Sequence, residues 1–306
     1  MIARDCVRSV TELGRATFLG RATHCKAEFY SFSAALCPWL MRQVCRCRDE
    51  AYRMGGIALD TPVWGDDVDL SEGCVQVVVW DVERLAVMGG YRYMLGGEVS
   101  VDSFVLYKDY FLTSRFVGHY MDGSMELGRS FVSISYMRGA GTHTIYALDA
   151  LWEALGRVVV GCDVRYLFGR VTLYPSMSFR ARNLLVGFMR YVYPSCDALF
   201  VARRRVNVGM GRCRCGEIFT GESIEDNYRI LLHQMRLLGC SVPPIISSYM
   251  RLSSTMQTFD ACLNDELGGG VEVAIMLTVD DFYDHVKRRY LSCVDSCGER
   301  AVVGRR

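Results

Sequence analysis

A glutamate and an arginine lie three positions apart in an otherwise apolar segment of this 306-residue chain. Residues 126–141 read ELGRSFVSISYMRGAG, so Glu126 and Arg129 are surrounded by leucine, phenylalanine, valine and isoleucine. A carboxylate buried among such side chains is a candidate general base, because burial raises its pKa toward a useful value. A neighbouring arginine can offset that rise or bind an anion.

The spacing of the two charges raises a geometric question. In a regular strand, positions 126 and 129 face opposite sides of the sheet. Glu126 and Arg129 can meet only across a β-bulge, an extra residue in one strand that is frequent beside active sites. Either the two residues pair across such a bulge, or they serve two separate surfaces. In both cases they are catalytic or substrate-binding groups, or they belong to a structural ion pair that bridges the strand to a helix.

A glycine-rich turn follows this segment and precedes an amphipathic helix. Its residues are Arg138, Gly139, Ala140 and Gly141. Glycines allow the backbone to approach a phosphate closely, and the free amides of a helix N-terminus attract anions. The turn is therefore a candidate phosphate cradle, with a plain strand-to-helix turn as the alternative. His143, at the start of the helix, is either a base or a structural residue.

Periodicity predicts the elements that position these residues. Alternating or β-branched segments predict strands, and apolar residues at i, i+3 and i+7 predict helices. Strands that first group together and then alternate with helices indicate a mixed α/β fold, a sheet covered by helices. The expected strands cover residues 26–34, 74–81, 85–97, the segment from 126, 164–174 and 271–279, and the expected helices cover 7–20, 38–54, 142–155, 178–193 and 222–239.

No repeat, linker or low-complexity tract divides the sequence. We therefore expect one domain over residues 1–306, with a helical extension at 1–25 and a mobile loop at 203–221. The N-terminal residues lack the apolar core of a signal peptide, and no run of about 18 uncharged apolar residues exists that could span a membrane. These features predict a cytoplasmic protein with reduced thiols.

Charge and cysteine spacing argue against two classes of site. The 35 basic and 34 acidic residues leave a net charge of +1, so no overall field attracts nucleic acid. The fourteen cysteines form no CxxC pair, and no histidines follow the CxC pairs at zinc-finger spacing, so we expect no metal. The basic runs at 203–205 and 287–289 either bind an acidic partner or are solvated.

Several longer motifs resemble a known family. The segments ELGRSFV, YLFGRVTL…SFRARNLLVGFMR and VPPIISSYMRLSSTMQTF…NDELGGGVEVAIML resemble a bacterial family of GNAT-type N-acyltransferases. That family includes the ornithine-lipid and glycine-lipid synthases, and its members often carry the label hemolysin. The resemblance extends from about residue 26 to residue 292. It implies the GNAT fold, with a mixed, largely antiparallel sheet flanked by helices.

The resemblance also implies an activity. It predicts an acyltransferase that moves a (3-hydroxy) fatty acyl group from acyl carrier protein to the α-amine of glycine or ornithine in aminolipid biosynthesis. The donor would be the acyl-phosphopantetheine thioester of acyl carrier protein, or acyl-CoA, with no permanently bound cofactor. The partners would be acyl carrier protein, the amino acid acceptor and the surface of the inner membrane. Glu126 and Arg129 would be catalytic, and residues 138–141 would hold the cofactor phosphate.

Four further residues in the family-like motifs are candidates for substrate binding. Ser178 either contacts the substrate or caps a helix, and Arg182 either binds the carboxylate of the amino acid through a bidentate fork or is solvated. Tyr249 and Arg251, in the stretch SSYMRL, either line the site or pack against the sheet.

Three other functions remain to be weighed. A lysolipid O-acyltransferase would carry a His-x-x-x-x-Asp motif, which this sequence lacks. A non-catalytic acyl-carrier or lipid-binding module would keep the fold without needing Glu126. A membrane-lytic protein would need an amphipathic hairpin of membrane length or a spanning segment, and neither is present in the sequence.

Overall fold

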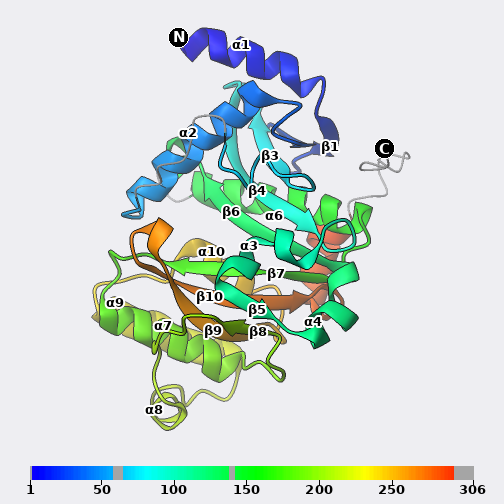
Figure 1. The fold of residues 1–306 in the computed structure, drawn as a ribbon. Coiled ribbons are helices and arrows are strands. Elements are labelled where there is room, and N and C mark those ends of the chain that lie inside the picture. The colour runs from blue at the N-terminus through cyan, green and yellow to red at the C-terminus, as the bar shows by residue number, and fades with distance from the viewer. Residues whose placement is uncertain (1, 58–64, 138–141, 293–306) are drawn as a thin grey trace. The chain divides into compact units, whose positions relative to one another are not determined.

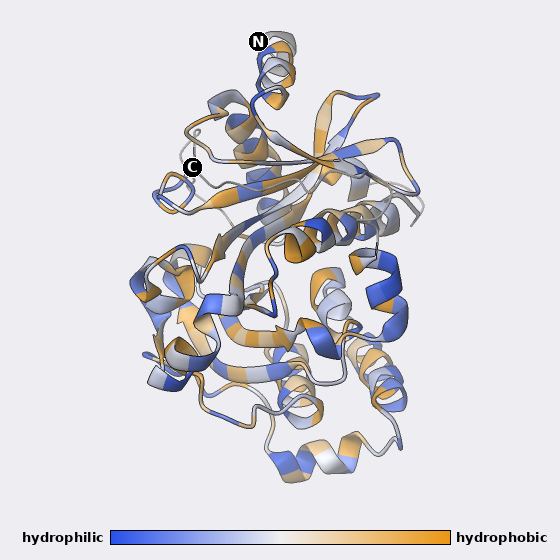
Figure 2. Cartoon of the chain, turned by 90° about the vertical axis from the view of Figure 1, so that its right-hand side faces the viewer, coloured by the Kyte–Doolittle hydropathy of each residue, from blue (hydrophilic) through white to orange (hydrophobic). Residues whose placement is uncertain are grey.

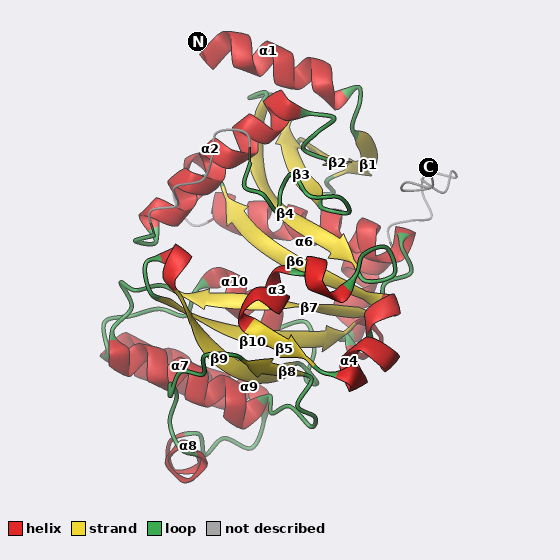
Figure 3. Cartoon of the chain, viewed as in Figure 1, coloured by secondary structure: helices red, strands yellow, loops and turns green. Residues whose placement is uncertain are grey.

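The computed structural model describes residues 2–57, 65–137 and 142–292, and in these the chain forms two compact units (Figure 1). The first unit combines residues 1–99, 125–165 and 284–306, and the second combines residues 100–124 and 166–283. Figure 3 shows that each unit contains both strands and helices. Polar and apolar residues alternate along these elements, as expected where one side is buried (Figure 2).

The first unit is built on an antiparallel sheet. Its order is β1 (Thr17–Arg21), β2 (Ala27–Phe32), β3 (Val75–Asp81), β4 (Ala86–Leu95) and β6 (Ser124–Val132). Each strand runs antiparallel to the next. The sequence of β3, VQVVVWD, is rich in β-branched residues, which suits a strand that is almost entirely buried.

Two long helices cover opposite faces of this sheet. Tyr91 of β4 packs against Trp152 of α6 (Thr142–Gly161), with 6.3 Å between ring centroids. The next residue, Arg92, faces the other way and reaches the loop that follows α2 (Pro38–Met54). Pro38 suits the first turn of α2, where a missing N–H costs nothing. The other helices are α1 (Ile2–Leu13), α5 (Ile134–Met137), α11 (Asp284–Val286) and a π-helical turn at Lys287–Leu291.

The second unit contains two antiparallel sheets. One has the order β7 (Tyr166–Leu173), β10 (Gly270–Thr278) and β9 (Gln257–Asn264), and the other pairs β5 (Tyr110–Leu112) with β8 (Phe200–Ala202). Phenylalanine rings join the two sheets. The ring of Phe200 in β8 stacks on that of Phe168 in β7, with 5.5 Å between centroids, and meets that of Phe259 in β9 edge-on at 4.8 Å. The helices are α3 (Val105–Asp109), α4 (Ser114–His119), α7 (Phe179–Val192), α8 (Arg212–Ile218), α9 (Ile224–Leu237) and α10 (Pro244–Met250).

The fold class predicted from the sequence is confirmed, because the chain is a mixed α/β protein with mostly antiparallel sheets flanked by helices. The predicted strands and helices recur within a few residues, and β3 and β4 form the predicted hairpin. No helix in the described residues is both long enough and apolar enough to cross a membrane.

Two segments differ in part from the elements expected there. The helix expected at 7–20, within the helical extension 1–25, ends at Leu13, and Thr17–Arg21 instead forms β1 against β2. Gly14 follows the helix directly, and Phe18 of β1 then packs against Tyr30 of β2 with 5.5 Å between ring centroids. Within the loop expected at 203–221, Arg212–Ile218 forms the helix α8, and the mobility of the loop stays a prediction.

A pair of glycines in β4 allows its neighbours to approach closely. A Cβ atom on Gly89 would lie 2.7 Å from the carbonyl oxygen of Phe131, and one on Gly90 would lie 2.8 Å from that of Val77. Both oxygens belong to backbone of adjacent strands, so neither can swing aside as a side chain would. The pairing register also shifts near these glycines. The shift lies at Val79/Trp80 where β3 pairs with β4, and at Gly90/Arg92 where β4 pairs with β6.

Replacing Gly90 with alanine is therefore expected to lower the free energy of unfolding by about 1–3 kcal/mol, the usual cost of overpacking a core. The measurement is a denaturant titration followed by circular dichroism. Gly161→Ala is the matched control, since nothing lies within 4 Å of a Cβ atom at that position. Equal stability of the two variants would show that β4 can shift to accept the methyl group.

Candidate functional site

Strand β6 contains a bulge between Glu126 and Phe131, the feature that allows the side chains of Glu126 and Arg129 to share one face. Between the pairs Gly90–Phe131 and Arg92–Gly128, β6 has one residue more than β4. Arg129 lies in this extra length with φ of 51°, in the left-handed region that residues other than glycine rarely adopt. The bulge breaks the alternation of side chains along β6. The side chain of Arg129 is therefore not forced to point to the face opposite Glu126.

The contacts of Arg129 indicate the face to which it turns. Glu126 and Gly128 share one face of β6, because residues two apart in a strand point the same way. Arg92 is paired with Gly128 and crosses it, since its Nε lies 3.5 Å from the position of a Cβ on Gly128. Asp66 accepts hydrogen bonds from Arg92 at 2.7 Å and from Arg129 at 3.1 Å. The head of Arg129 thus lies on the face that carries Glu126.

A second aspartate extends this group into the interior of the first unit. Asp69 accepts two hydrogen bonds from the guanidinium of Arg48, at 2.6 and 3.1 Å, and one each from Arg92 and Gln76, both at 3.1 Å. Asp69 is 1% exposed and Arg48 is 0% exposed. The two aspartates are also tied to each other, because the amide of Asp69 donates to Asp66 at 2.8 Å and the reverse bond is 3.0 Å long.

These contacts keep the buried charges ionised. Burial alone would raise the pKa of Asp69, but the guanidinium groups of Arg48 and Arg92 hold it well below its usual range. Burial raises the pKa of the neighbouring thiols of Cys45 and Cys74 to about 12. The two cysteines are thus neutral at physiological pH and are not nucleophiles.

The result is a graded cluster, which we call the Arg–Asp network: Arg48, Asp66, Asp69, Arg92 and Arg129. Its inner end is fully buried, and at its outer end the side chain of Arg129 is 16% exposed and that of Asp66 is 20% exposed. Glu126, which is 5% exposed, lies on the same face of the sheet. A carboxylate able to accept a proton and a guanidinium able to bind an anion therefore lie on the same face of one strand.

Several predicted site residues fall elsewhere. Arg138, Gly139, Ala140 and Gly141 lie outside the described residues, and so does the side chain of His143. The role predicted for residues 138–141 in holding a phosphate therefore stays a prediction.

The four candidates for substrate binding lie in the second unit. Ser178 is the N-cap of α7, because its Oγ accepts a hydrogen bond from the amide of Ala181 at 3.3 Å. Arg182 is half-buried over the ring of Phe179, and Arg251 is exposed, with its guanidinium 5.8 Å from the ring of Tyr228. Tyr249 is buried in α10. Their part in binding a substrate stays a prediction.

Sequence reasoning missed most of the Arg–Asp network, namely Arg48, Asp66, Asp69 and Arg92. One signal was present, because Arg92 interrupts the apolar stretch of β4 in the same way that Glu126 and Arg129 interrupt β6. A charge in a buried strand needs a partner of opposite sign. The acidic segment WGDDVDL, residues 64–70, was available to provide one.

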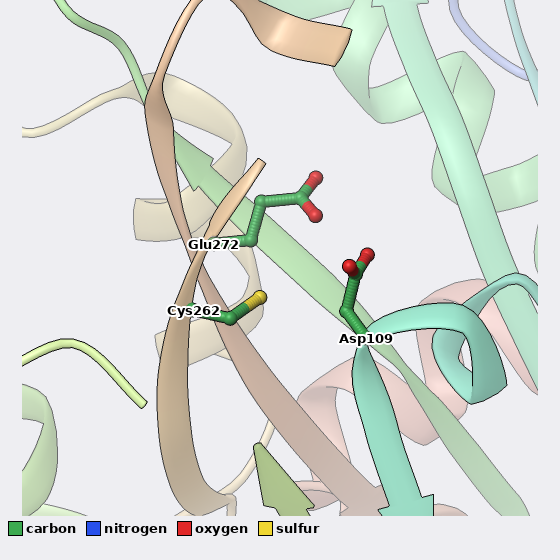
Figure 4. A group of neighbouring side chains, drawn as sticks. All are labelled: Asp109, Cys262 and Glu272. Atoms are coloured by element: carbon green, nitrogen blue, oxygen red, sulfur yellow. The ribbon is translucent and has the colours of Figure 1, made fainter. Parts of the chain in front are cut away.

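A separate cluster in the second unit has the residue types of a metal site. Asp109, Cys262 and Glu272 place one potential ligand atom each within 4.8 Å of one another (Figure 4). However, the guanidinium of Arg170 lies 2.5 Å from a carboxylate oxygen of Asp109 and 2.7 Å from one of Glu272. Burial also raises the pKa of Cys262 to about 11. A metal ion would have to displace Arg170, so we interpret the cluster as a buried ion pair that joins α3 to β7 and β10.

Comparison with known proteins gives two relatives of similar length. A glycine N(alpha)-acyltransferase of Bacteroides thetaiotaomicron is 30% identical over 272 residues, which cover 86% of this chain and 81% of that protein. A glycine N(alpha)-acyltransferase of Phocaeicola vulgatus is 31% identical over 272 residues, covering 86% of this chain and 83% of that protein. No family model matches the sequence.

Solved structures are more distant. An N-acyl amino acid synthase from uncultured soil microbes aligns over 88% of this chain and 96% of that chain, with a TM-score of 0.42 and 8% identity. A CoA-dependent acyl-homoserine lactone synthase aligns over 85% and 93%, with a TM-score of 0.38 and 12% identity. Likeness at this level supports no inference about mechanism.

Proposed function

Because this chain belongs to the family of the glycine N(alpha)-acyltransferases, we propose that it acylates the α-amine of glycine. The donor is a 3-hydroxy fatty acyl group carried as a phosphopantetheine thioester on acyl carrier protein, and the product is the first intermediate of an aminolipid. The identity of 30% and 31% to two enzymes of that name, over most of their length, is the observation that carries this proposal. It also favours glycine over ornithine as the acceptor.

The Glu–Arg face of β6 supports amine acylation as the reaction. At neutral pH the amine of glycine is mostly an ammonium ion, which has no lone pair to attack a carbonyl. The carboxylate of Glu126 accepts the proton, directly or through water. The amine nitrogen then bonds to the thioester carbonyl carbon, and the resulting oxyanion collapses with breakage of the C–S bond. The nitrogen loses a second proton to the departing thiolate, and Glu126 releases the first to water, which leaves N-acylglycine, the free phosphopantetheine thiol and the carboxylate of Glu126.

The remaining parts of the donor site extend this proposal. We place the phosphate of the phosphopantetheine arm at residues 138–141, between β6 and α6. We do not propose the basic run at 203–205 as the docking surface for acyl carrier protein, because its arginines already have partners. Arg204 pairs with Asp265 and Arg205 pairs with Asp260, each at 3.0 Å, and Arg203 stacks over Phe111. Because the product is amphiphilic, we also propose that the protein works in the cytoplasm, in peripheral contact with the inner membrane.

The test is a reaction of the purified protein with isotope-labelled glycine and either 3-hydroxyacyl carrier protein or the matching acyl-CoA. We expect labelled N-acylglycine, formed faster from acyl carrier protein than from CoA, as measured by mass spectrometry. Parallel reactions contain ornithine or a lysophospholipid in place of glycine. Faster formation of acyl-ornithine or of a diacyl phospholipid would contradict the proposed acceptor. The absence of any acylated product would contradict the enzyme assignment.

A further inference from the structure

We propose that Arg129 binds the carboxylate of the acceptor, so that Glu126 and Arg129 together recognise the zwitterion of an α-amino acid. This inference rests on the proposed function and adds a residue that determines specificity. An α-amino acid carries its ammonium and its carboxylate on a single carbon, so a site for it needs an anion and a cation close together. The bulge in β6 supplies both on one face, with Glu126 for the ammonium and Arg129 for the carboxylate.

Arg129 is the arginine of the network that a ligand can reach. Arg48 uses both terminal nitrogens on Asp69 and is fully buried. Arg92 is 4% exposed and bonds both aspartates through one terminal nitrogen, and its free Nε is buried like that of Arg48. In the described parts of the chain, the side chain of Arg129 donates a hydrogen bond from its Nη2 to Asp66. Its other N–H groups are available on a side chain that is 16% exposed. Two parallel N–H groups of a guanidinium match the two oxygens of a carboxylate.

The backbone of Arg129 is an independent sign of function. Its φ of 51° is unfavourable for a residue with a side chain, and a glycine would adopt it without cost. Unfavourable backbone geometry of this kind gathers at ligand-binding sites, where the surrounding structure enforces it. Here the enforcement comes from the register of β4 and β6 and from the bond to Asp66.

Asp66 is the residue that positions Arg129. It is itself held by the amide of Asp69 and by the buried guanidinium of Arg92. Two bonds from the interior thus fix one carboxylate oxygen of Asp66, and its other oxygen fixes Arg129. The buried part of the network therefore orients the guanidinium of Arg129, which binds the substrate. This role explains why charged residues are retained in the buried interior of the first unit.

The experiment compares glycine with glycinamide, which has the same amine but no carboxylate. The kcat/KM of each acceptor is measured with saturating acyl carrier protein and is expressed per unprotonated amine, because the two amines differ in pKa. The proteins are the wild type, Arg129→Met and Arg129→Lys. Arg21→Met is the matched control, since Arg21 is an exposed arginine of the same unit that pairs with Glu28.

We expect the wild type to prefer glycine strongly. Arg129→Met should lower kcat/KM for glycine by about 30- to 1000-fold, the usual effect of removing one partner of a desolvated charge pair, and should leave the value for glycinamide within about 3-fold. Arg129→Lys should retain part of the preference, because a lysine supplies the charge without the fork. Arg21→Met should behave as the wild type. An unchanged glycine-to-glycinamide ratio in folded Arg129→Met would overturn the inference.

Asp66→Asn provides a second route if Arg129→Met does not fold. Because Arg129 is still present but less firmly held, KM for glycine should rise by at least 10-fold with a smaller change in kcat, and KM for glycinamide should not change. An equal rise of both KM values would count against the inference. Failure of the wild type to acylate either amine would instead refute the proposed function, so the two failures are distinguishable.

Discussion

Replacing Glu126 with glutamine is expected to lower kcat for glycine acylation by about two to four orders of magnitude at neutral pH. Glutamine preserves the volume of the side chain and one of its accepting oxygens but cannot accept the proton of the ammonium. Arg129 retains its ion pair with Asp66 at 3.1 Å, so the substitution does not strip this arginine of its partner. We therefore expect the thermal midpoint to remain close to that of the wild type. The measurements are kcat from product formation and a thermal melt.

The pH dependence of the Glu126→Gln variant separates a base from a structural group. As the pH rises, free amine becomes abundant without help, so the rate of a variant that lacks only the base should partly recover. Glu83→Gln is the control, because Glu83 is an exposed glutamate that bonds Lys26. A large drop in thermal midpoint would instead assign Glu126 to a structural ion pair. Normal turnover together with normal stability would show that Glu126 is neither the general base nor part of a structural ion pair.

Replacing Asp69 with asparagine is expected to destabilise the first unit by roughly 3–5 kcal/mol. The variant leaves Arg48, which is fully buried, without its bidentate partner, and it removes one of the two aspartates that face Arg92. Domains are commonly stable by only about 5–15 kcal/mol, so this loss should move the denaturant midpoint far toward zero. Asp67→Asn is the matched control, because Asp67 is exposed two positions away.

The same residue predicts how stability depends on pH. The pKa of Asp69 lies below its usual range in the folded protein, so its carboxylate stabilises the fold at neutral pH. This contribution is fully present above the unfolded-state pKa of about 3.9, and it is lost as the pH falls from there toward the folded-state pKa. The stability gap between wild type and Asp69→Asn should therefore shrink below about pH 4. A constant gap down to pH 2 would show that Asp69 is not the titrating group.

Local sequence patterns were sufficient for most of the elements, and they indicated where a bulge could occur. The β-branched run of β3, the serine before α7 and the two charges in β6 each act within a few residues, and the structure has a strand, an N-cap and a bulge in these places. Residues 7–20 carry two competing local signals. At 7–20 the apolar periodicity of α1 concealed Gly14 and the strand-forming residues that follow it.

The Arg–Asp network could not be derived in the same way. Its bonds join residues far apart in the chain, with 21 positions between Arg48 and Asp69, 26 between Asp66 and Arg92, and 63 between Asp66 and Arg129. A single sequence shows which buried charges need partners, but pairing one with another depends on the register of β4 and β6. The sequence therefore predicted the two charges of the site on β6. It did not predict their partners on α2, on β4 and in the segment between α2 and β3.

The last segment of the first unit has a consequence for synthesis on the ribosome. Residues 284–291 pack on α6, where Arg289 and Tyr290 both bond Asp149 and where Gly156 leaves room for the backbone of Tyr290. Residues 166–283 of the second unit are translated before this segment. The nascent first unit must therefore keep the apolar surface of α6 uncovered until most of the second unit has emerged. A pause or truncation before residue 284 leaves that surface open to chaperones or to aggregation.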